Sequence, residues 1–257
     1  YLRKCISSLC SGEAITALDV IIINDGSTDN TSAIAHEYAA AYPGSVRVID
    51  KANGGHGSGI NAAVKLAEGK YFMALDSDDW VITENLPKLL GILGKISSDV
   101  VLCNYHMVDM MSGRRQPFIT GALATGREYG IEEFMTYPAD ARRCCYYHGI
   151  IYRLDFYRDT GITLSEGIFY EDQEYATLPF YRAETIFPTD IFLYQYQVGN
   201  ARQSISGANQ AKNMWQIEKV LWNIVDFYNA HSDMPECKRE YFLFKMSTFL
   251  LSYYVAG

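Results

Sequence analysis

The stretch Leu75-Asp76-Ser77-Asp78-Asp79-Trp80 decides how this chain is organised. It continues an apolar and aromatic run, residues 71–75, which has the pattern of an interior strand. Carboxylates at the end of such a strand are expected at the carboxyl edge of an open α/β sheet, where ligands usually bind. Two ionised carboxylates there repel each other, so either one is protonated or a cation lies between them. Oxygen ligands suit hard ions, which favours Mg2+ or Mn2+ at Asp76 and Asp78. The alternative is a solvated turn or a helix N-cap, above all for Asp79.

The length and composition are those of an ordinary globular protein. The chain has 257 residues, of which 49% are hydrophobic, enough for one large core or two modest ones. A formal net charge of -8 argues against nucleic-acid binding, which depends on Lys and Arg neutralising phosphates. The six cysteines form no CxxC pair and have no zinc-finger spacing, so we expect reduced thiols in a cytoplasmic protein.

The sequence shows no transmembrane segment. No apolar run reaches about 18 residues, and the first residues do not resemble a signal peptide. The start, from Tyr1, has helical apolar spacing but no capping residue, so we expect a cut end there. The aromatic residues after 240 are expected to pack in a helix, and a peripheral contact with the inner face of the membrane is the alternative.

Strands and helices are predicted to alternate in the first half of the chain. The strands are 17–23, 47–50, 71–75 and 98–105, and the helices are 32–41, 60–67 and 83–93. This alternation predicts an α/β fold with a mostly parallel sheet and right-handed crossovers. Later elements are a hairpin tip at 113–115, strands 149–152 and 191–197, and helices 131–137, 174–181, 214–228 and from about 238 onward. We therefore expect one domain over 1–207, with halves 1–105 and 106–207, and a helical extension over 208–257.

Two polar loops are predicted at the same sheet edge as the acids. Asn24-Asp25-Gly26-Ser27 follows the first predicted strand, and its functional interpretation is a nucleoside pocket in which Asp25 accepts a hydrogen bond from a base. The alternative is an Asx turn that closes the connection to the helix. The glycine-rich segment 53–59 lacks the spacing of a Walker or dinucleotide motif, but its N–H groups could still contact phosphates.

In this order, the motifs resemble those of the family 2 glycosyltransferases, which have the GT-A fold. The stretches that carry the resemblance are Asn24-Asp25-Gly26-Ser27-Thr28-Asp29, Asn53-Gly54-Gly55, and Gly69-Lys70-Tyr71 leading into Leu75-Asp76-Ser77-Asp78-Asp79. The resemblance is specific over residues 6 to about 105. It continues more loosely through 151–153, 167–172 and 202–206.

The resemblance implies a metal-dependent, inverting transfer from a nucleotide sugar, with UDP as the expected nucleotide, to a glycan or lipid-linked acceptor. It also implies site residues. Asp76 and Asp78 are expected to bind Mn2+ or Mg2+, and Asp172, with Glu171 beside it, is expected to be catalytic. Contacts to the nucleotide sugar are expected from Asp25, Gly26, Ser27, Asn53, Gly54, Gly55, Asp76 and Ser77.

The chemistry expected of Asp172 follows from the weak nucleophilicity of a hydroxyl group. A carboxylate within hydrogen-bond reach can remove the acceptor's proton as it attacks, while the metal and loop N–H groups stabilise the departing diphosphate. The alternative for Glu171-Asp172 is the charged first turn of a helix, where acids interact well with the helix dipole.

The sequence departs from the family pattern in three places. The family's opening strand is not found before residue 1, and the Gln-x-x-Arg-Trp motif of processive enzymes is absent, which argues against a processive polymerase. His148 stands near a position that often carries Lys or Asn. His148 and His56 are candidates for metal or phosphate contacts, and ordinary loop or core histidines are the alternative.

Two other functions remain open at this point. A nucleotidyltransferase shares the sheet and the acidic metal site, although the Gly-rich stretch with Arg and Lys that it needs near its first strand is not found. A non-catalytic module that binds a nucleotide sugar or a glycan is the second rival.

Overall fold

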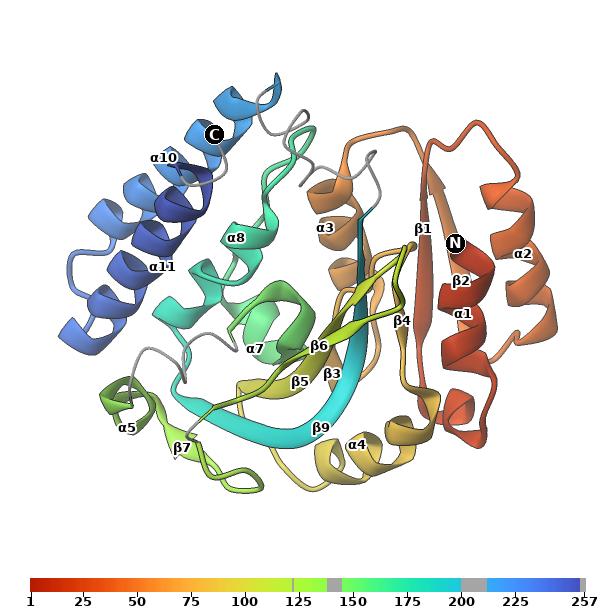
Figure 1. Ribbon diagram of the computed structural model, residues 1–257, viewed down its shortest axis with the longest axis horizontal. Coiled ribbons are helices and arrows are strands. Elements are labelled where there is room, and N and C mark those ends of the chain that lie inside the picture. Colours follow the sequence, from red (N-terminus) through yellow and green to blue (C-terminus); the bar gives the residue numbers. More distant parts are fainter. Residues whose placement is uncertain (122, 138–144, 200–211, 255–257) are drawn as a thin grey trace.

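The computed structural model describes residues 1–121, 123–137, 145–199 and 212–254, and it has a mixed α/β architecture (Figure 1). The first half contains α1 (Leu2–Cys10), β1 (Val20–Asp25), α2 (Thr31–Ala41), β2 (Val46–Lys51), α3 (His56–Leu66), β3 (Tyr71–Phe72), β4 (Trp80–Val81), α4 (Leu86–Leu93) and β5 (Val100–Asp109). The second half contains β6 (Arg115–Phe118), β7 (Tyr129–Gly130), α5 (Ile131–Thr136), β8 (Ile150–Arg153), α7 (Leu154–Asp159), α8 (Asp172–Tyr175), β9 (Thr185–Val198), α10 (Met214–Ala230) and α11 (Glu236–Tyr254). The predicted α/β class is confirmed.

Within the described residues, the strands form two sheets. Strands β1 and β2 pair in parallel, from Val20 opposite Val46 to Asp25 opposite Lys51. The larger sheet has the order β3-β8-β5-β9-β4, with β6 added to β5 and β7 added to β9. Its long central strands β5 and β9 are parallel, and its remaining pairs are antiparallel. The long, curved β9 therefore connects the centre of the sheet with the short strand that follows the acidic turn.

Three local predictions were wrong. The strand expected over 71–75 is formed only at Tyr71–Phe72, as β3. Helix α3 begins at His56 rather than at residue 60, because Gly55 has a φ of 83° and turns the chain directly into the helix. The helix predicted over 174–181 is instead the short α8 followed by a 3₁₀ turn at Leu178–Tyr181. Pro179 lacks the N–H group that a continuous α-helix would need there.

The main hydrophobic core joins the sheet to the two C-terminal helices. Tyr241 of α11 is fully buried, its ring stacks on Phe180 with centroids 4.4 Å apart, and its hydroxyl donates to the carbonyl of Ala176. Figure 1 shows α10 and α11 on the side of the molecule away from α1 and α2. The prediction that the C-terminal aromatic residues serve helix packing is confirmed for Tyr241, Phe242 and Phe249, which are buried. In the part of the chain that the structure describes, no helix combines the length and hydrophobicity needed to cross a membrane.

Candidate active site

The acidic motif forms the turn between β3 and β4. Asp79 is only 1% exposed, and its two carboxylate oxygens accept hydrogen bonds from Tyr194 Oη and from the backbone N–H of Gln197, each at 2.7 Å. Burial and the nearby charge of Asp76 raise the pKa of Asp79 to about 8. The alternative of a solvated turn or helix N-cap is therefore wrong for Asp79, which is buried and followed by a strand.

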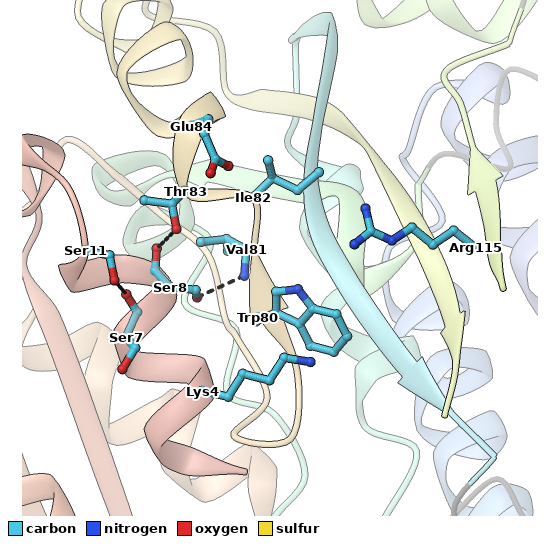
Figure 2. Close-up of a pocket in the computed structure, with 10 residues that line it drawn as sticks. All are labelled: Lys4, Ser7, Ser8, Ser11, Trp80, Val81, Ile82, Thr83, Glu84 and Arg115. Carbon is cyan, nitrogen blue, oxygen red and sulfur yellow. Dashed lines mark hydrogen bonds between the residues drawn. The ribbon is translucent and has the colours of Figure 1, made fainter. Parts of the chain in front are cut away.

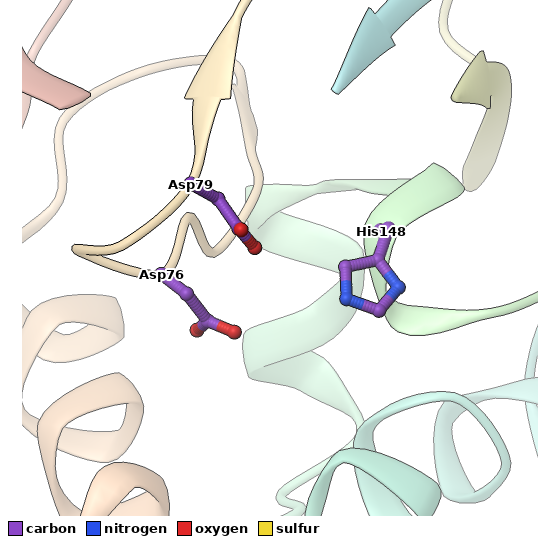
Figure 3. Close-up of side chains that lie close together, drawn as sticks. All are labelled: Asp76, Asp79 and His148. Atoms are coloured by element: carbon purple, nitrogen blue, oxygen red, sulfur yellow. The ribbon is translucent and has the colours of Figure 1, made fainter. Parts of the chain in front are cut away.

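Asp76, Asp79 and His148 bring one oxygen or nitrogen each within 4.8 Å of one another (Figure 3). His148 lies on the 3₁₀ turn before β8, and its ring stacks on Tyr196 with centroids 4.0 Å apart. Partial burial lowers the pKa of His148 to about 4, so its imidazole is neutral at physiological pH and can act as a ligand. The two carboxyl groups suit Mn2+ or Mg2+, provided that Asp79 loses its proton when the ion binds, and the neutral imidazole offers a nitrogen ligand beside them. Asp78, the other predicted metal ligand, is half-buried on the same turn and is not part of this group.

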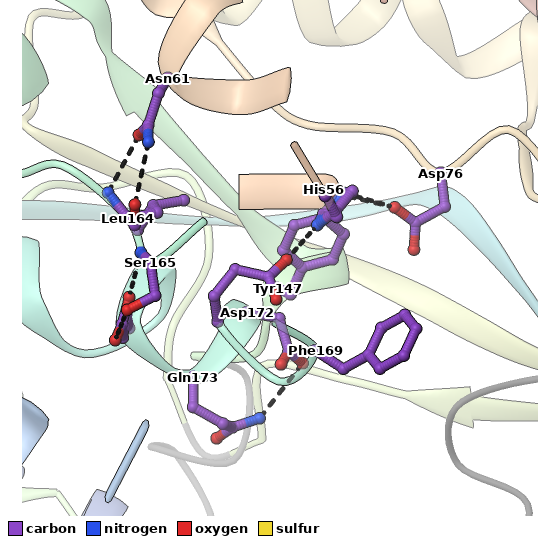
Figure 4. Close-up of polar contacts among 12 residues, drawn as sticks. His56, Asn61, Asp76, Tyr147, Leu164, Ser165, Phe169, Asp172 and Gln173 are labelled. Carbon is purple, nitrogen blue, oxygen red and sulfur yellow. Dashed lines mark hydrogen bonds and ion pairs between the residues drawn. The ribbon is translucent and has the colours of Figure 1, made fainter. Parts of the chain in front are cut away.

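His56 lies between two acids that are far apart in the sequence, and Figure 4 shows it beside Asp76. Its Nε2 is 3.0 Å from Asp76 Oδ1, and its Nδ1 is 2.6 Å from Glu171 Oε1. Partial desolvation lowers the pKa of His56, but the charges of Asp76 and Glu171 outweigh it and hold this pKa well above its usual value. Partial burial likewise raises the pKa of Asp76, but the charge of His56 outweighs it and holds that pKa below its usual value.

Tyr147 completes this contact from the 3₁₀ turn that also carries His148. Its hydroxyl donates to Asp76 Oδ1 at 3.0 Å and lies 3.0 Å from His56 Nε2. The ring is buried, so the hydroxyl is fixed beside the acidic turn. Asp76 therefore interacts with residues of both halves of the chain.

Asp172 and Glu171 have different surroundings at the start of α8. Glu171 is 2% exposed and its carboxylate contacts His56, whereas Asp172 is half-buried and its Oδ2 accepts a hydrogen bond from Gln173 Nε2 at 3.2 Å. Burial and the charge of Glu171 raise the pKa of Asp172 to about 6. A carboxylate with this pKa is ionised at neutral pH and is a better proton acceptor than an ordinary aspartate.

Close backbone packing brings the glycine-rich segment 53–59 against residues 165–171, the segment that leads into α8. Gly167 N–H donates to the carbonyl of Gly54 at 2.6 Å. A Cβ on Gly57 would lie 2.2 Å from the Ser165 carbonyl oxygen and 2.9 Å from Glu171 Cγ, so only glycine fits there. The first turn of α3 and the segment before α8 are thereby held in direct contact.

The carboxylate of Asp25 holds the glycine-rich segment on its other side. It accepts hydrogen bonds from the N–H groups of Gly54 and Gly55 at 2.9 and 2.8 Å and from Lys51 Nζ at 2.6 Å. Partial burial raises the pKa of Asp25, but these three donors outweigh it and lower that pKa. Gly26, with a φ of 72°, brings the first polar loop against Asn53, which is exposed. The polar loops and the acidic turn predicted from the sequence are thus neighbours, linked by Asp25 and His56.

Sequence reasoning missed the tyrosines of the site. Tyr147, Tyr194 and Tyr196 surround His148 and the acidic turn, and the first two donate hydrogen bonds to its carboxylates. The high tyrosine content of the sequence was the only signal, and it did not separate these residues from the core. The segment 202–206 lies outside the described residues.

A separate surface hollow of about 350 Å³ lies between α1, the start of β4 and β6 (Figure 2). Lys4 Nζ lies 2.8 Å from the centroid of the Trp80 ring, and Arg115 reaches the hollow from β6. None of the predicted site residues lines it.

Comparison with known proteins identifies relatives over most of the chain. The family model described as "Glycosyl transferase family 2" matches residues 1–160. The chain is 27% identical over 244 residues to the uncharacterized glycosyltransferase EpsJ of Bacillus subtilis, covering 93% of this chain and 69% of that protein. It is 29% identical over 227 residues to the uncharacterized glycosyltransferase YibD of Escherichia coli, covering 85% of this chain and 65% of that protein.

Solved structures share the fold. The chain matches Staphylococcus aureus TarS 1–349 in complex with UDP-GlcNAc with a TM-score of 0.70, at 20% identity, over 99% of this chain and 69% of that one. It matches the mannosyltransferase PcManGT of Pyrobaculum calidifontis, in complex with GDP-Man and Mn2+, with a TM-score of 0.60, at 12% identity, over 99% of this chain and 69% of that one. These likenesses confirm the predicted GT-A fold.

Proposed function

Because the chain belongs to glycosyl transferase family 2, we propose that it transfers a sugar from a nucleotide-sugar donor to an acceptor hydroxyl with inversion at the anomeric carbon. The observation that carries this proposal is the pair of acids joined through His56. Asp76 lies on the acidic turn, and Glu171 immediately precedes Asp172, whose pKa is raised to about 6. A binding module has no need of a tuned proton acceptor beside an acidic ligand site.

In this proposal Asp172 is the general base. Its carboxylate takes the proton of the acceptor hydroxyl as the hydroxyl oxygen attacks the anomeric carbon. The bond from that carbon to the diphosphate oxygen breaks on the opposite face, so the configuration is inverted and the nucleoside diphosphate leaves. Glu171 is assigned a supporting part, because its buried carboxylate faces His56 rather than the surface.

The donor is proposed to bind across the two polar loops and the acidic turn. Its nucleotide and sugar would contact Asp25, Gly26, Ser27, Asn53, Gly54, Gly55, Asp76 and Ser77. Asp76 and Asp78 would hold Mn2+ or Mg2+, with His148 and Asp79 close enough to Asp76 to belong to the same site. The ion would neutralise charge on the departing diphosphate.

We also propose the division of labour predicted from the sequence. Residues 1–105 would bind the nucleotide sugar, residues 106–207 would bind the acceptor and supply the base, and residues 208–257 would support them as a helical extension. UDP is proposed as the nucleotide, in line with the ligand of the TarS complex.

The proposed acceptor is a glycan or a lipid-linked sugar in cell-surface polysaccharide synthesis, with the protein in the cytoplasm or at the inner face of the membrane. Over 81 residues, the chain is 42% identical to the hyaluronan synthase of Pasteurella multocida. The aligned segment covers 32% of this chain and 8% of that protein. That relative's name supports a polysaccharide role for this chain.

Calorimetric titration with UDP tests the donor site. UDP should bind tightly with Mn2+ and weakly with chelator, and Asp78→Asn should remove most of the difference. Asp190→Asn is a matched control, because Asp190 is exposed and pairs with Lys88 on the surface. Equal affinity with Mn2+ and with chelator would contradict the metal assignment.

Transfer assays with a panel of UDP-sugars and acceptors test the chemistry. Asp172→Asn should leave the UDP affinity unchanged while turnover falls by roughly two to four powers of ten, the usual worth of general base catalysis. Glu171→Gln should lower turnover less than Asp172→Asn does. Near-normal turnover of Asp172→Asn would rule out the base assignment, and a retained anomeric configuration in the product would rule out direct displacement.

A further inference from the structure

The contact made by His56 joins the two sides of the proposed active site. Asp76 belongs to the turn proposed to hold the donor, and Glu171 directly precedes the proposed base. The two ring nitrogens lie 3.0 Å from Asp76 Oδ1 and 2.6 Å from Glu171 Oε1, so a single side chain spans both acids. Figure 4 shows the ring between Asp76 and the segment that carries Asp172.

The backbone that carries His56 is closely packed on both sides. His56 is the first residue of α3, preceded by Gly55 with a positive φ and followed by Gly57, which touches Ser165 and Glu171 without room for a Cβ. Gly167 also donates to the carbonyl of Gly54. These contacts hold the backbone from which the ring extends.

Glu171 depends on this contact. Its side chain is 3% exposed, and a buried carboxylate without a partner is strongly disfavoured. The side chain of His56, which bridges Asp76 and Glu171, is 40% exposed. This bridge therefore lies at the edge of the site, where a bound ligand can reach Asp76. A ligand bound at Asp76 would therefore act on the same ring that contacts Glu171.

We propose that His56 is a positioning residue that couples occupation of the donor site at Asp76 to the placement of Asp172 through Glu171. This inference rests on the proposed function and adds to it a link between the donor and acceptor sides. With donor bound at Asp76, the bridge holds the start of α8 in the arrangement that presents Asp172 to the acceptor. Without the bridge, the donor still binds, but the base is poorly placed.

The two arms of the bridge can be separated by substitution. The amide nitrogen of Asn lies near the place of histidine Nδ1, so His56→Asn keeps the arm to Glu171 and removes the arm to Asp76. The longer Gln side chain places its amide nitrogen near Nε2, so His56→Gln keeps the arm to Asp76. His56→Ala removes both arms. His231→Asn is the control, since His231 directly follows α10, where its Nδ1 lies 2.8 Å from the Phe227 carbonyl oxygen and its ring packs on Phe227 and Tyr181.

Hydrogen exchange of residues 165–175, measured with and without UDP and Mn2+, is the direct test. In the wild type and in His231→Asn, the ligand should slow exchange in this segment several-fold, and this protection should be lost in His56→Ala, His56→Asn and His56→Gln. Ligand-induced protection that persists in His56→Ala, or that is absent in the wild type with UDP bound, overturns the proposal.

Steady-state kinetics give an independent readout. The UDP–Mn2+ affinity of the three His56 variants should stay within a few-fold of wild type, while kcat falls on the order of 100-fold, the scale expected when a reacting group is misplaced. The double variant of His56→Asn and Glu171→Gln should lose no more than the worse single variant. A kcat unchanged in His56→Asn overturns the bridge. Failure of the proposed function is distinguishable, because it is seen as absent transfer or absent UDP binding in the wild type.

Discussion

Tyr194 Oη donates a 2.7 Å hydrogen bond to Asp79 Oδ2, and Tyr194 Oη also accepts a 3.1 Å hydrogen bond from the backbone N–H of Asp76. A single hydroxyl from β9 thus ties together the first and last acids of the acidic turn. The acidic turn is thereby tied to strand β9 of the larger sheet.

Replacing Tyr194 by Phe should loosen this turn. The buried Asp79 Oδ2 and the partly buried N–H of Asp76 would lose this hydrogen bond, at a cost of about 1–3 kcal/mol in the free energy of unfolding, and UDP–Mn2+ affinity should fall. Urea unfolding and calorimetry measure the two effects. Tyr181→Phe is the control, because its hydroxyl donates to the carbonyl of Thr160 away from the acids, so it should lower stability without changing UDP affinity.

Asp79 should make stability fall as the pH rises. Its pKa is raised to about 8 in the folded protein, against about 3.9 for an unfolded aspartate, so the folded state binds more protons between these values. The contribution of Asp79 to the free energy of unfolding is complete below about pH 4 and is lost as the pH rises through about 8. Asp79→Asn should remove this dependence, and the difference in unfolding free energy between variant and wild type should move in favour of the variant from pH 5.5 to 9. A constant difference would contradict the assignment.

The transfer rate should depend on the ionisation of Asp172. Because the base works only as the carboxylate and its pKa is raised to about 6, kcat/KM should rise with pH between 5 and 7 and then level off. Glu171→Gln removes a neighbouring negative charge that raises this pKa, so the acid limb should move to lower pH. An unchanged acid limb would show that another group controls the profile.

Lys245 should shift the acid limb of the kcat/KM pH profile in the opposite direction to Glu171. It is buried on α11, donates to the carbonyl of Cys145 at 2.8 Å, and its charge lowers the pKa of Asp172. Lys245→Met should therefore raise the pKa of Asp172 and move the acid limb to higher pH. Lys88→Met, a change at an exposed lysine that pairs with Asp190, should leave the profile in place.

Gly57→Ala tests the contact between α3 and the segment before α8. The added Cβ would lie 2.2 Å from the Ser165 carbonyl oxygen, so either α3 or the 165–171 segment must move. We expect a loss of stability of about 2 kcal/mol or more and a reduced kcat. Gly91→Ala in α4 is the matched helical control: nothing lies within 4 Å of its added Cβ, so stability should rise by about 0.5–1 kcal/mol.

Local patterns in the sequence were sufficient to predict most strands and helices of the first half of the fold, although β3 is limited to Tyr71–Phe72. Apolar runs such as residues 17–23 and 98–105 are long enough, and their ends polar enough, to predict β1 and β5. The segment 53–59 misled because glycine disfavours helices in isolation. Packing against Ser165 overrode that preference, and the helix begins at His56.

The sequence by itself determined the family and the α/β class and pointed to the acids of the candidate site, because motifs at strand ends are local and their order follows the chain. Only the tertiary structure decided which acid faces which partner. Asp79 is held by Tyr194, Asp25 by the amides of Gly54 and Gly55, and Glu171 by His56. These contacts join residues far apart in the chain, and the pKa of each carboxylate depends on burial and on charges that only the folded chain brings together.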